Sequence, residues 1–425
     1  MPSRRLLFAF AGLVVPSVAL LAALAPAGCS TDNGEITYGP DYGPLPKRDG
    51  ASDEAGDDPR EGGTPDPDGA PSDEDGGEEG AAPCANGTIA VLAGDDSSLS
   101  GAIQDKNGAW VTSPIAGGAA KSKPALVAFG AGFLGVTHGA GDALQTTSYA
   151  SGAWTGATAF GNAGVKGAPS LAVAGTKAHV VYSAGPGSNR DYAHGIHDGT
   201  SWNAATAKVG SPDFSFGTVS AGLAAVGDEV VFAENGTNHG LYVRSFEASW
   251  SASEAISGAG TVGTDFAGTP ELVAVEGAFD LLLAYTDNDP SKAIAFATRD
   301  NAAPASWKNG GNVAGATTTE KFALSRVGQF TVLLTFRGED GNGYYTQGTI
   351  GSNNVSWSAP KPIGGGAAFA VDSTPAVAKG VCGDDAVVAY ASGGVVRVTR
   401  LRGTTWTSSE SAGTASGRRV AIATK

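Results

Sequence analysis

The stretch PSLAVAGTKAHVVYSAGPGSNRDYAHGIHDGTSW, residues 169–202, contains the pattern that decides the fold. It holds an apolar run at 169–173, a glycine-containing turn, a second run that reaches Tyr182, and a third, alternating run before Trp202. Alternation, β-branched residues and frequent glycine turns are typical of short β-strands. The stretch therefore predicts three or four strands that follow one another closely, and no helix.

The same pattern recurs along the chain and leads each time to a tryptophan. First runs recur at 124–128, 270–274 and 375–378, and second runs at 229–232, 281–285, 332–336 and 387–390. The tryptophans are spaced by 44 to 57 residues: Trp110, Trp154, Trp202, Trp250, Trp307, Trp357 and Trp406. Units of this length with several short strands are typical of β-propeller blades, which need neighbours to cover both of their faces.

The two ends of the repeat region complete each other. Residues 88–92 look like a second run that lacks its first run, and residues 418–423 look like a first run that nothing follows. Joined, they make one blade, which is the closure that many propellers use. The sequence therefore predicts an all-β, seven-bladed β-propeller over residues 84–425, closed by its C-terminal strand.

The N-terminus has the pattern of an export signal. Arg4 and Arg5 precede an apolar run at 6–25, and small residues then lead to Cys29. This arrangement resembles the lipobox of bacterial lipoproteins, although Pro26 stands where that motif usually has leucine. The resemblance implies a signal peptide at 1–28, a diacylglyceryl group on Cys29 and attachment to a membrane. An uncleaved signal anchor is the alternative, and the paired arginines also resemble a twin-arginine signal.

Residues 29–83 form a segment of different composition. Positions 30–83 hold 16 acidic and three basic residues and almost no apolar ones, so most of the net charge of −15 lies there. Such a segment cannot bury enough surface to fold, and its like charges favour extension. We expect a lipidated, disordered acidic linker. By resemblance to Gram-negative sorting rules, Ser30 favours the outer membrane or cell surface. The chain has no basic patch, so nucleic-acid binding is not expected.

The three cysteines give an odd count in an exported chain. With Cys29 lipidated, Cys84 and Cys382 remain for one disulfide. Both lie in turns before second strands of adjacent blades, which places them on one face where the ring closes. The alternative is two unrelated thiols.

The tryptophans favour a structural role, because seven in register are expected to fill the spaces between neighbouring sheets. The alternative is sugar stacking on exposed indoles. In repeat length and tryptophan spacing the chain resembles propeller lectins that bind fucose between blades. The segments Asp105–Trp110 and His197–Trp202 resemble the Asp-box turns of sialidase-type propellers without their full pattern. The resemblance implies the propeller fold and a glycan ligand.

Catalytic and metal-binding patterns are weak. The arginines that a sialidase would need do not recur in a frame that marks a triad: Arg190, Arg244, Arg299, Arg326, Arg337 and Arg397. Residues 337–340 (RGED) are interpreted as a solvated loop and 287–290 (DNDP) as a turn rather than a calcium site. His194 and His197 are three apart on a strand, so they point to opposite faces and form a poor metal site.

We therefore expect no catalytic residue, metal or cofactor. The favoured hypothesis is a membrane-anchored binding protein whose propeller faces the surface or periplasm and takes a glycan or a protein. The alternatives are a sialidase-type glycosidase and a non-catalytic structural component of the cell envelope.

Overall fold

The computed structural model describes residues 87–425 except 106, 162–163, 185–190, 210–220, 236–239, 257–269, 287–290 and 303–305. The signal peptide, Cys29, the acidic linker and Cys84 lie outside these residues and stay predictions. Within the described part, no helix is long and apolar enough to cross a membrane.

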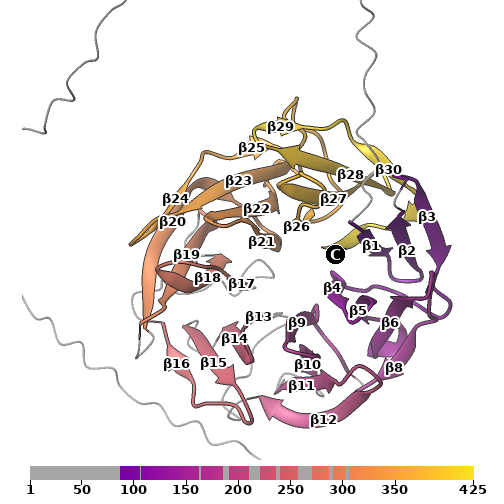
Figure 1. Cartoon of the computed structure of the whole chain (residues 1–425), viewed down its shortest axis with the longest axis horizontal. Coiled ribbons are helices and arrows are strands. Elements are labelled where there is room, and N and C mark those ends of the chain that lie inside the picture. The colour runs from indigo at the N-terminus through magenta and orange to yellow at the C-terminus, as the bar shows by residue number, and fades with distance from the viewer. Residues whose placement is uncertain are drawn as a thin grey trace, which may run out of the picture. The chain divides into compact units, whose positions relative to one another are not determined.

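Seven antiparallel sheets surround a common axis, as Figure 1 shows. We number them as blades 1 to 7. Each blade has four successive antiparallel strands, and blades 2, 6 and 7 carry a fifth strand that pairs with the third. A short 3-10 helix, η1 (Ala140–Asp142), lies within blade 2. The predicted seven-bladed propeller is confirmed.

Blades 1 to 4 are made as follows. Blade 1 contains β31 (Arg419–Thr424), β1 (Ile89–Gly94), β2 (Leu99–Gln104) and β3 (Trp110–Pro114). Blade 2 contains β4 (Ala125–Phe129), β5 (Gly132–His138), β6 (Leu144–Ala150), β7 (Ala153–Trp154) and β8 (Thr158–Phe160). Blade 3 contains β9 (Ser170–Ala174), β10 (Lys177–Ala184), β11 (Asp191–His197) and β12 (Trp202–Val209). Blade 4 contains β13 (Gly222–Val226), β14 (Glu229–Asn235), β15 (Leu241–Phe246) and β16 (Glu254–Ala255).

Blades 5 to 7 complete the ring. Blade 5 contains β17 (Glu271–Ala274), β18 (Phe279–Thr286), β19 (Ala293–Asp300) and β20 (Trp307–Thr317). Blade 6 contains β21 (Phe322–Gly328), β22 (Thr331–Arg337), β23 (Gly343–Ile350), β24 (Val355–Trp357) and β25 (Lys361–Pro362). Blade 7 contains β26 (Ala376–Lys379), β27 (Ala386–Ser392), β28 (Val395–Arg402), β29 (Thr405–Trp406) and β30 (Glu410–Ser416).

The ring closes as the sequence predicts. The last strand, β31, pairs antiparallel with β1 over its whole length, from Ile89 opposite Thr424 to Gly94 opposite Arg419. The chain's end therefore supplies the innermost strand of the blade that the first strands begin. Figure 1 accordingly shows the C-terminus beside the centre of the ring.

The core consists of separate hydrophobic clusters, each shared by two neighbouring blades. Every tryptophan of the series packs against a different cluster, on the side of the preceding blade. Trp154, for example, lies on Gly101 of blade 1 so closely that a Cβ at Gly101 would come within 2.2 Å of the indole. Six of the seven indole N–H groups are buried with no hydrogen-bond partner in the described part of the chain, which fits packing rather than polar recognition.

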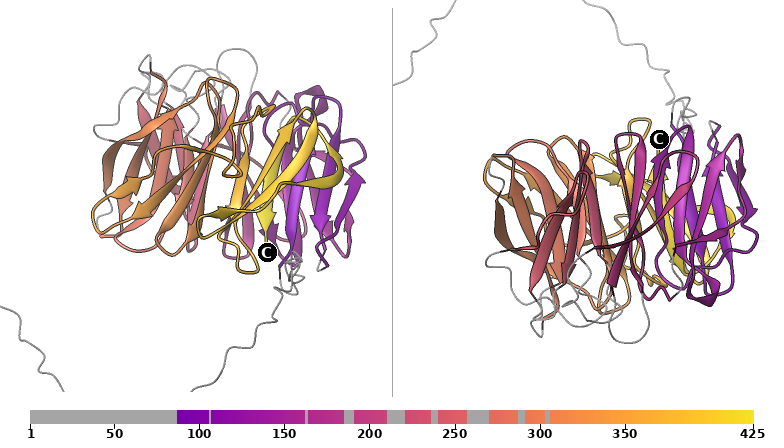
Figure 2. Two further views of the ribbon diagram at one scale, coloured as in Figure 1. Left: turned by 90° about the horizontal axis from the view of Figure 1, so that it is seen from above. Right: turned by 90° about the horizontal axis from the view of Figure 1, so that it is seen from below.

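The ring has two distinct faces, seen edge-on in Figure 2. The innermost strand of each blade runs in the same direction, so all seven begin at one face, which we call the entry face. β31 ends at the other face beside the start of β1, so Gly87, the first described residue, lies at that face. We call this second face the tether face.

The predicted disulfide remains a prediction, because Cys84 precedes the described residues. Gly87, three residues later in the chain, lies against the 380–385 turn of blade 7. A Cβ built at Gly87 would be 3.0 Å from the Sγ of Cys382 and 2.7 Å from Val381. This closeness supports the proposed pairing at the ring's junction.

Candidate functional site

A pocket of about 750 Å³ opens between blades 2 and 3. Its walls are strands β5 and β6, the β4–β5 turn, the β9–β10 turn and the β11–β12 turn. These turns lie where the innermost strands end, so the pocket is on the tether face. Gly130 and Gly175 have φ of +54° and +56°, which residues with a side chain rarely adopt, and they make the two turns tight.

Four rings line the pocket: Phe129, Phe133, Tyr149 and His197. Phe129 and His197 meet edge to face across the blade boundary, with ring centroids 5.4 Å apart and planes at 88°. Trp202 packs on His197 in the same manner, with centroids 5.1 Å apart. Tyr149 rests on Trp154 at 5.4 Å. Each ring is thus held by a neighbouring aromatic residue and presents a fixed surface.

His197 has a defined hydrogen-bonding role. The backbone N–H of Gly199 donates to its Nδ1 at 3.0 Å, so a neutral ring must carry its proton on Nε2. Burial lowers the pKa of His197, and the nearby Asp198 carboxylate only partly opposes this effect. At neutral pH the residue is therefore an uncharged hydrogen-bond donor in the pocket wall.

The rest of the lining is made of hydroxyl groups and glycine backbone. Thr147 donates its hydroxyl to the carbonyl of Thr155 at 2.7 Å, and Thr155 Oγ1 accepts the N–H of Ser148 at 2.9 Å. No aspartate, glutamate, lysine or arginine is among the described residues that line the pocket. The pocket can therefore pack an apolar face and hydrogen-bond a neutral, hydroxylated ligand.

The two segments that resemble Asp-box turns both connect a third strand to a fourth. Asp105 Oδ1 accepts the N–H groups of Asn107 and Ala109, each at 2.9 Å. Asp198 accepts those of Thr200 and Ser201 at 2.8 and 2.9 Å, and these bonds lower its pKa. The aspartates therefore brace turns, and the second of them shapes the pocket wall.

His194 and His197 point to opposite faces of β11, as predicted. His197 contacts blade 2, whereas His194 is 1% exposed and contacts Phe246 and Trp250 of blade 4. His194 Nε2 lies 3.0 Å from Nδ1 of His179, and the two rings stack. Burial lowers the pKa of His179 to about 4 and that of His194 to about 3. No group of metal-ligating side chains occurs among the described residues.

The same interface buries an ion pair on blade 4. Arg244 Nε donates to Oε1 of Glu234 at 3.2 Å, and both side chains are almost inaccessible. Glu234 Oε2 has no hydrogen-bond partner in the described part of the chain. Burial raises the pKa of Glu234 to about 7, against the opposing effect of Arg244. The contact between blades 3 and 4 is therefore rich in buried titratable groups.

The described arginines of the sequence analysis do not converge on one site. Arg244 pairs with Glu234 within blade 4, and Arg299 binds Asp280 and Glu229, which links blades 4 and 5. Arg326 pairs with Glu276 and Arg337 with Glu320. Arg397 lines a separate cavity of about 380 Å³ between blade 7 and the segment that connects blade 6 to it. Arg190 is outside the described residues. This dispersal does not provide the three-arginine carboxylate clamp of a sialidase.

Within residues 337–340, Glu339 and Asp340 are exposed, as expected of a solvated loop, and Arg337 is partly buried. Arg337 donates to the carbonyl of Val371 at 3.0 Å as well as to Glu320, and Tyr344 donates to Asp340 at 2.6 Å. These contacts tie blade 6 to the approach of blade 7. Residues 287–290, predicted as a turn, are outside the described residues.

Apart from the His197–Trp202 segment, the pocket residues were not identified from the sequence. Phe129 closes the first run of one unit, whereas His197 lies 68 positions later in a turn of the next. The feature of the sequence that could have indicated the pocket is the turn at residues 130–132 of blade 2, which contains two glycines and follows an aromatic residue.

No protein-family model and no curated protein sequence matches the chain. Among solved structures, AofleA from Arthrobotrys oligospora is 13% identical, with a TM-score of 0.50 over 72% of this chain and 90% of that one. The SapL1 lectin in complex with alpha methyl fucoside is 13% identical, with a TM-score of 0.50 over 68% and 96%. The six-bladed lectin of Aleuria aurantia is 15% identical, with a TM-score of 0.43 over 67% and 98%. At these identities the similarity concerns the fold.

Proposed function

We propose that this propeller binds carbohydrate and that the pocket between blades 2 and 3 holds a neutral sugar. The observation that carries the proposal is the lining: aromatic rings fixed by packing, hydroxyl groups and glycine backbone, with no charged side chain among the described lining residues. A sugar offers apolar C–H faces to aromatic rings and hydroxyls to polar groups. The similarity in fold to SapL1, which was solved with a fucoside, supports a sugar ligand.

The test is a glycan array with the purified protein, followed by calorimetry with the best ligand. We expect Phe129→Ala to weaken binding at least tenfold, because Phe129 forms the edge-to-face contact with His197 that closes the pocket. Phe330→Ala is the matched control, since Phe330 is a 48% exposed phenylalanine in a turn of blade 6. A folded protein that binds no glycan, or equal affinity in both variants, would refute the site.

We also propose that a lipid on Cys29 anchors the mature chain at the outer membrane or cell surface, through the acidic linker. The N-terminal pattern supports this, and the linker would join the ring at the tether face. Replacement of Cys29 by Ala should release the protein from membranes once the signal is processed. If the processed variant still partitions with membranes, the lipid anchor is wrong.

A further inference from the structure

A second cavity lies where blade 6 leads into blade 7. It has a volume of about 380 Å³ and is lined by residues of β27 and β28, of the segment 363–369 and of 407–409. Phe369 and Tyr390 meet in its wall, with ring centroids 4.8 Å apart and planes at 42°. Tyr390 is 4% exposed and belongs to the hydrophobic cluster between the two blades. The cavity therefore has an aromatic wall that packing holds in place.

Arg397 is the charged residue of this cavity. It lies on β28, opposite Tyr390 of β27, and is partly buried. Its guanidinium makes no hydrogen bond or ion pair within the described part of the chain, and no aspartate or glutamate is among the described residues that line the cavity. Partial burial takes water from a guanidinium, so a partner of opposite charge is favoured there.

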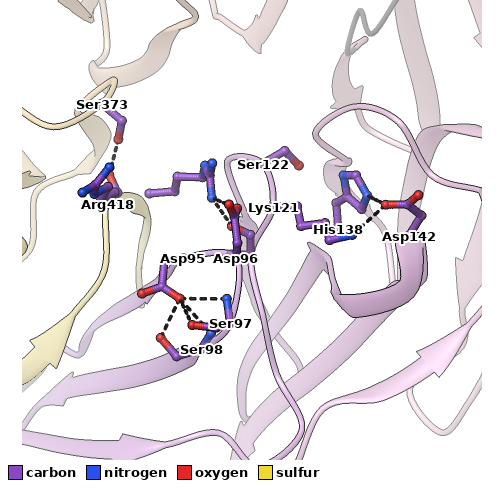
Figure 3. A network of polar contacts seen from close by, with 12 residues as sticks. Asp95, Asp96, Ser97, Ser98, Lys121, Ser122, His138, Asp142, Ser373 and Arg418 are labelled. Carbon is purple, nitrogen blue, oxygen red and sulfur yellow. Dashed lines mark hydrogen bonds and ion pairs between the residues drawn. The ribbon is translucent and has the colours of Figure 1, made fainter.

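Other partly buried cations of the ring have such a partner. Apart from Arg397, every described arginine that is not exposed pairs with a carboxylate. Lysine and histidine follow the same rule at the central channel, where Asp142 accepts from Lys121 at 2.8 Å and contacts His138 at 3.2 Å, as Figure 3 shows. Arg397 therefore departs from the charge pairing of its described neighbours.

Blade 4 has an arginine at the position that corresponds to Arg397. The register of blade 4 places Arg244 of its third strand opposite Phe232 of its second strand. The register of blade 7 places Arg397 of its third strand opposite Tyr390 of its second strand. In both blades the arginine thus faces the aromatic residue that ends the second apolar run, so the two arginines are equivalent in the repeat.

The carboxylate that accompanies this arginine is missing from blade 7. In blade 4, Glu234 follows two residues after the aromatic residue, on the same face of the strand, and Arg244 donates to it at 3.2 Å. The equivalent residue of blade 7 is Ser392, whose hydroxyl donates to the carbonyl of Ala370 at 2.8 Å. Ser392 and Arg397 both line the cavity. Blade 7 therefore has a cavity where blade 4 has a carboxylate.

We propose that this cavity binds an acidic sugar, whose carboxylate pairs with Arg397 in place of the missing glutamate. A guanidinium binds a carboxylate through two parallel N–H···O bonds. The rings of Phe369 and Tyr390 suit the apolar face of a sugar, and the hydroxyls of Ser408 and Ser409 suit its hydroxyl groups. The choice of a sugar rests on the proposed carbohydrate binding, but this site differs from the pocket between blades 2 and 3 in place and in charge.

Calorimetry on the full protein at low salt tests the proposal with galacturonate and glucuronate, against uncharged galactose and glucose. We expect at least one acidic sugar to bind and Arg397→Met to weaken that binding at least tenfold, because methionine keeps an apolar stem and removes the guanidinium. Arg418→Met is the matched control and should leave the affinity unchanged, since Arg418 is exposed and pairs with no carboxylate in the described part of the chain.

A second pair of variants tests the exchange of carboxylates. Ser392→Glu places beside Arg397 the carboxylate that blade 4 has, so it should compete with the ligand and weaken acidic-sugar binding at least tenfold without lowering the melting temperature. Ser392→Gln has nearly the same size and also removes the hydroxyl, but it carries no charge and should weaken binding far less. Equal losses in the two variants would contradict the pairing of the ligand's carboxylate with Arg397.

The proposal is overturned if neither acidic sugar binds, or if Arg397→Met binds the acidic sugar as the wild type does. It is also overturned if Arg397→Met weakens the binding of galactose or glucose as much as that of the acidic sugars. Phe129→Ala should weaken neutral-sugar binding and leave acidic-sugar binding intact. Failure of the pocket between blades 2 and 3 is therefore distinguishable from failure of this site.

Discussion

The buried histidine pair between blades 3 and 4 should make the propeller less stable in mild acid. His179 and His194 are 4% and 1% exposed, and burial lowers the pKa of both from 6.5, to about 4 and about 3. In the folded state both are therefore neutral at pH 5.5, whereas in the unfolded chain both are mostly protonated. The unfolded state binds more protons, so the free energy of unfolding falls as pH decreases below 6.5.

The size of this loss of stability depends only on the pKa of histidine in the unfolded chain, as long as both rings stay neutral in the folded protein. Between pH 7.5 and 5.5, each histidine removes about 1.4 kcal/mol of stability, and the pair removes about 3 kcal/mol. Glu234 acts in the opposite direction, because its raised pKa lets the folded state bind a proton first. Burial raises the pKa of Tyr192, so this residue stays protonated in this range. The total pH dependence of the wild type is therefore a difference of opposing effects.

The assay must isolate the histidines. Urea unfolding of the wild type and of His179→Gln/His194→Gln should be measured at pH 7.5, 6.5 and 5.5. The double variant will be less stable than the wild type at pH 7.5. Between pH 7.5 and 5.5, however, it should lose about 3 kcal/mol less unfolding free energy than the wild type loses. Glu234 is present in both proteins and cancels in the comparison. Equal pH dependence in the two proteins would refute the assignment of neutral, buried imidazoles.

Three further changes test the fold. Gly101→Ala places a Cβ within the van der Waals radius of Trp154 and should lower the free energy of unfolding by about 2 kcal/mol, measured by thermal unfolding. Gly366→Ala is the control and should cost far less, because the space around Gly366 is open. Equal effects of the two substitutions would contradict the packing of Trp154 on Gly101. Arg299→Met removes the partner of the partly buried carboxylates of Glu229 and Asp280 and should lower the free energy of urea unfolding by about 3 kcal/mol. A loss below about 1 kcal/mol would contradict the role of Arg299 in linking blades 4 and 5. Deletion of 418–425 removes the closing strand and should abolish a single cooperative unfolding transition in calorimetry; an unchanged transition would disprove closure by β31.

The fold could be predicted because each blade repeats one local pattern. The tryptophan at position 202 recurs in every unit and the run that ends at Tyr182 recurs in most of them, so seven units were visible without any long-range information. The closure was also visible, since 418–423 has the composition of a first strand without a partner. These are properties of short segments, and strand periodicity records them directly.

The candidate sites could not be predicted, because their residues become neighbours only through the ring. Phe129 and His197 are 68 positions apart, and nothing in the sequence around either one indicates the other. The pairing of His179 with His194 required the register of β10 and β11, which places Val181 opposite His194. Register depends on turn geometry, and the intervening residues gave no signal of it.

The proposed sugar pocket depends on one blade boundary. The sugar pocket needs only that blades 2 and 3 pack side by side, and their cluster of Val136, Leu144, Val180 and Tyr182 provides that contact locally. Weakening the pairing of β31 with β1 should therefore impair sugar binding less than weakening this cluster does, because the closing strand pair lies in blade 1.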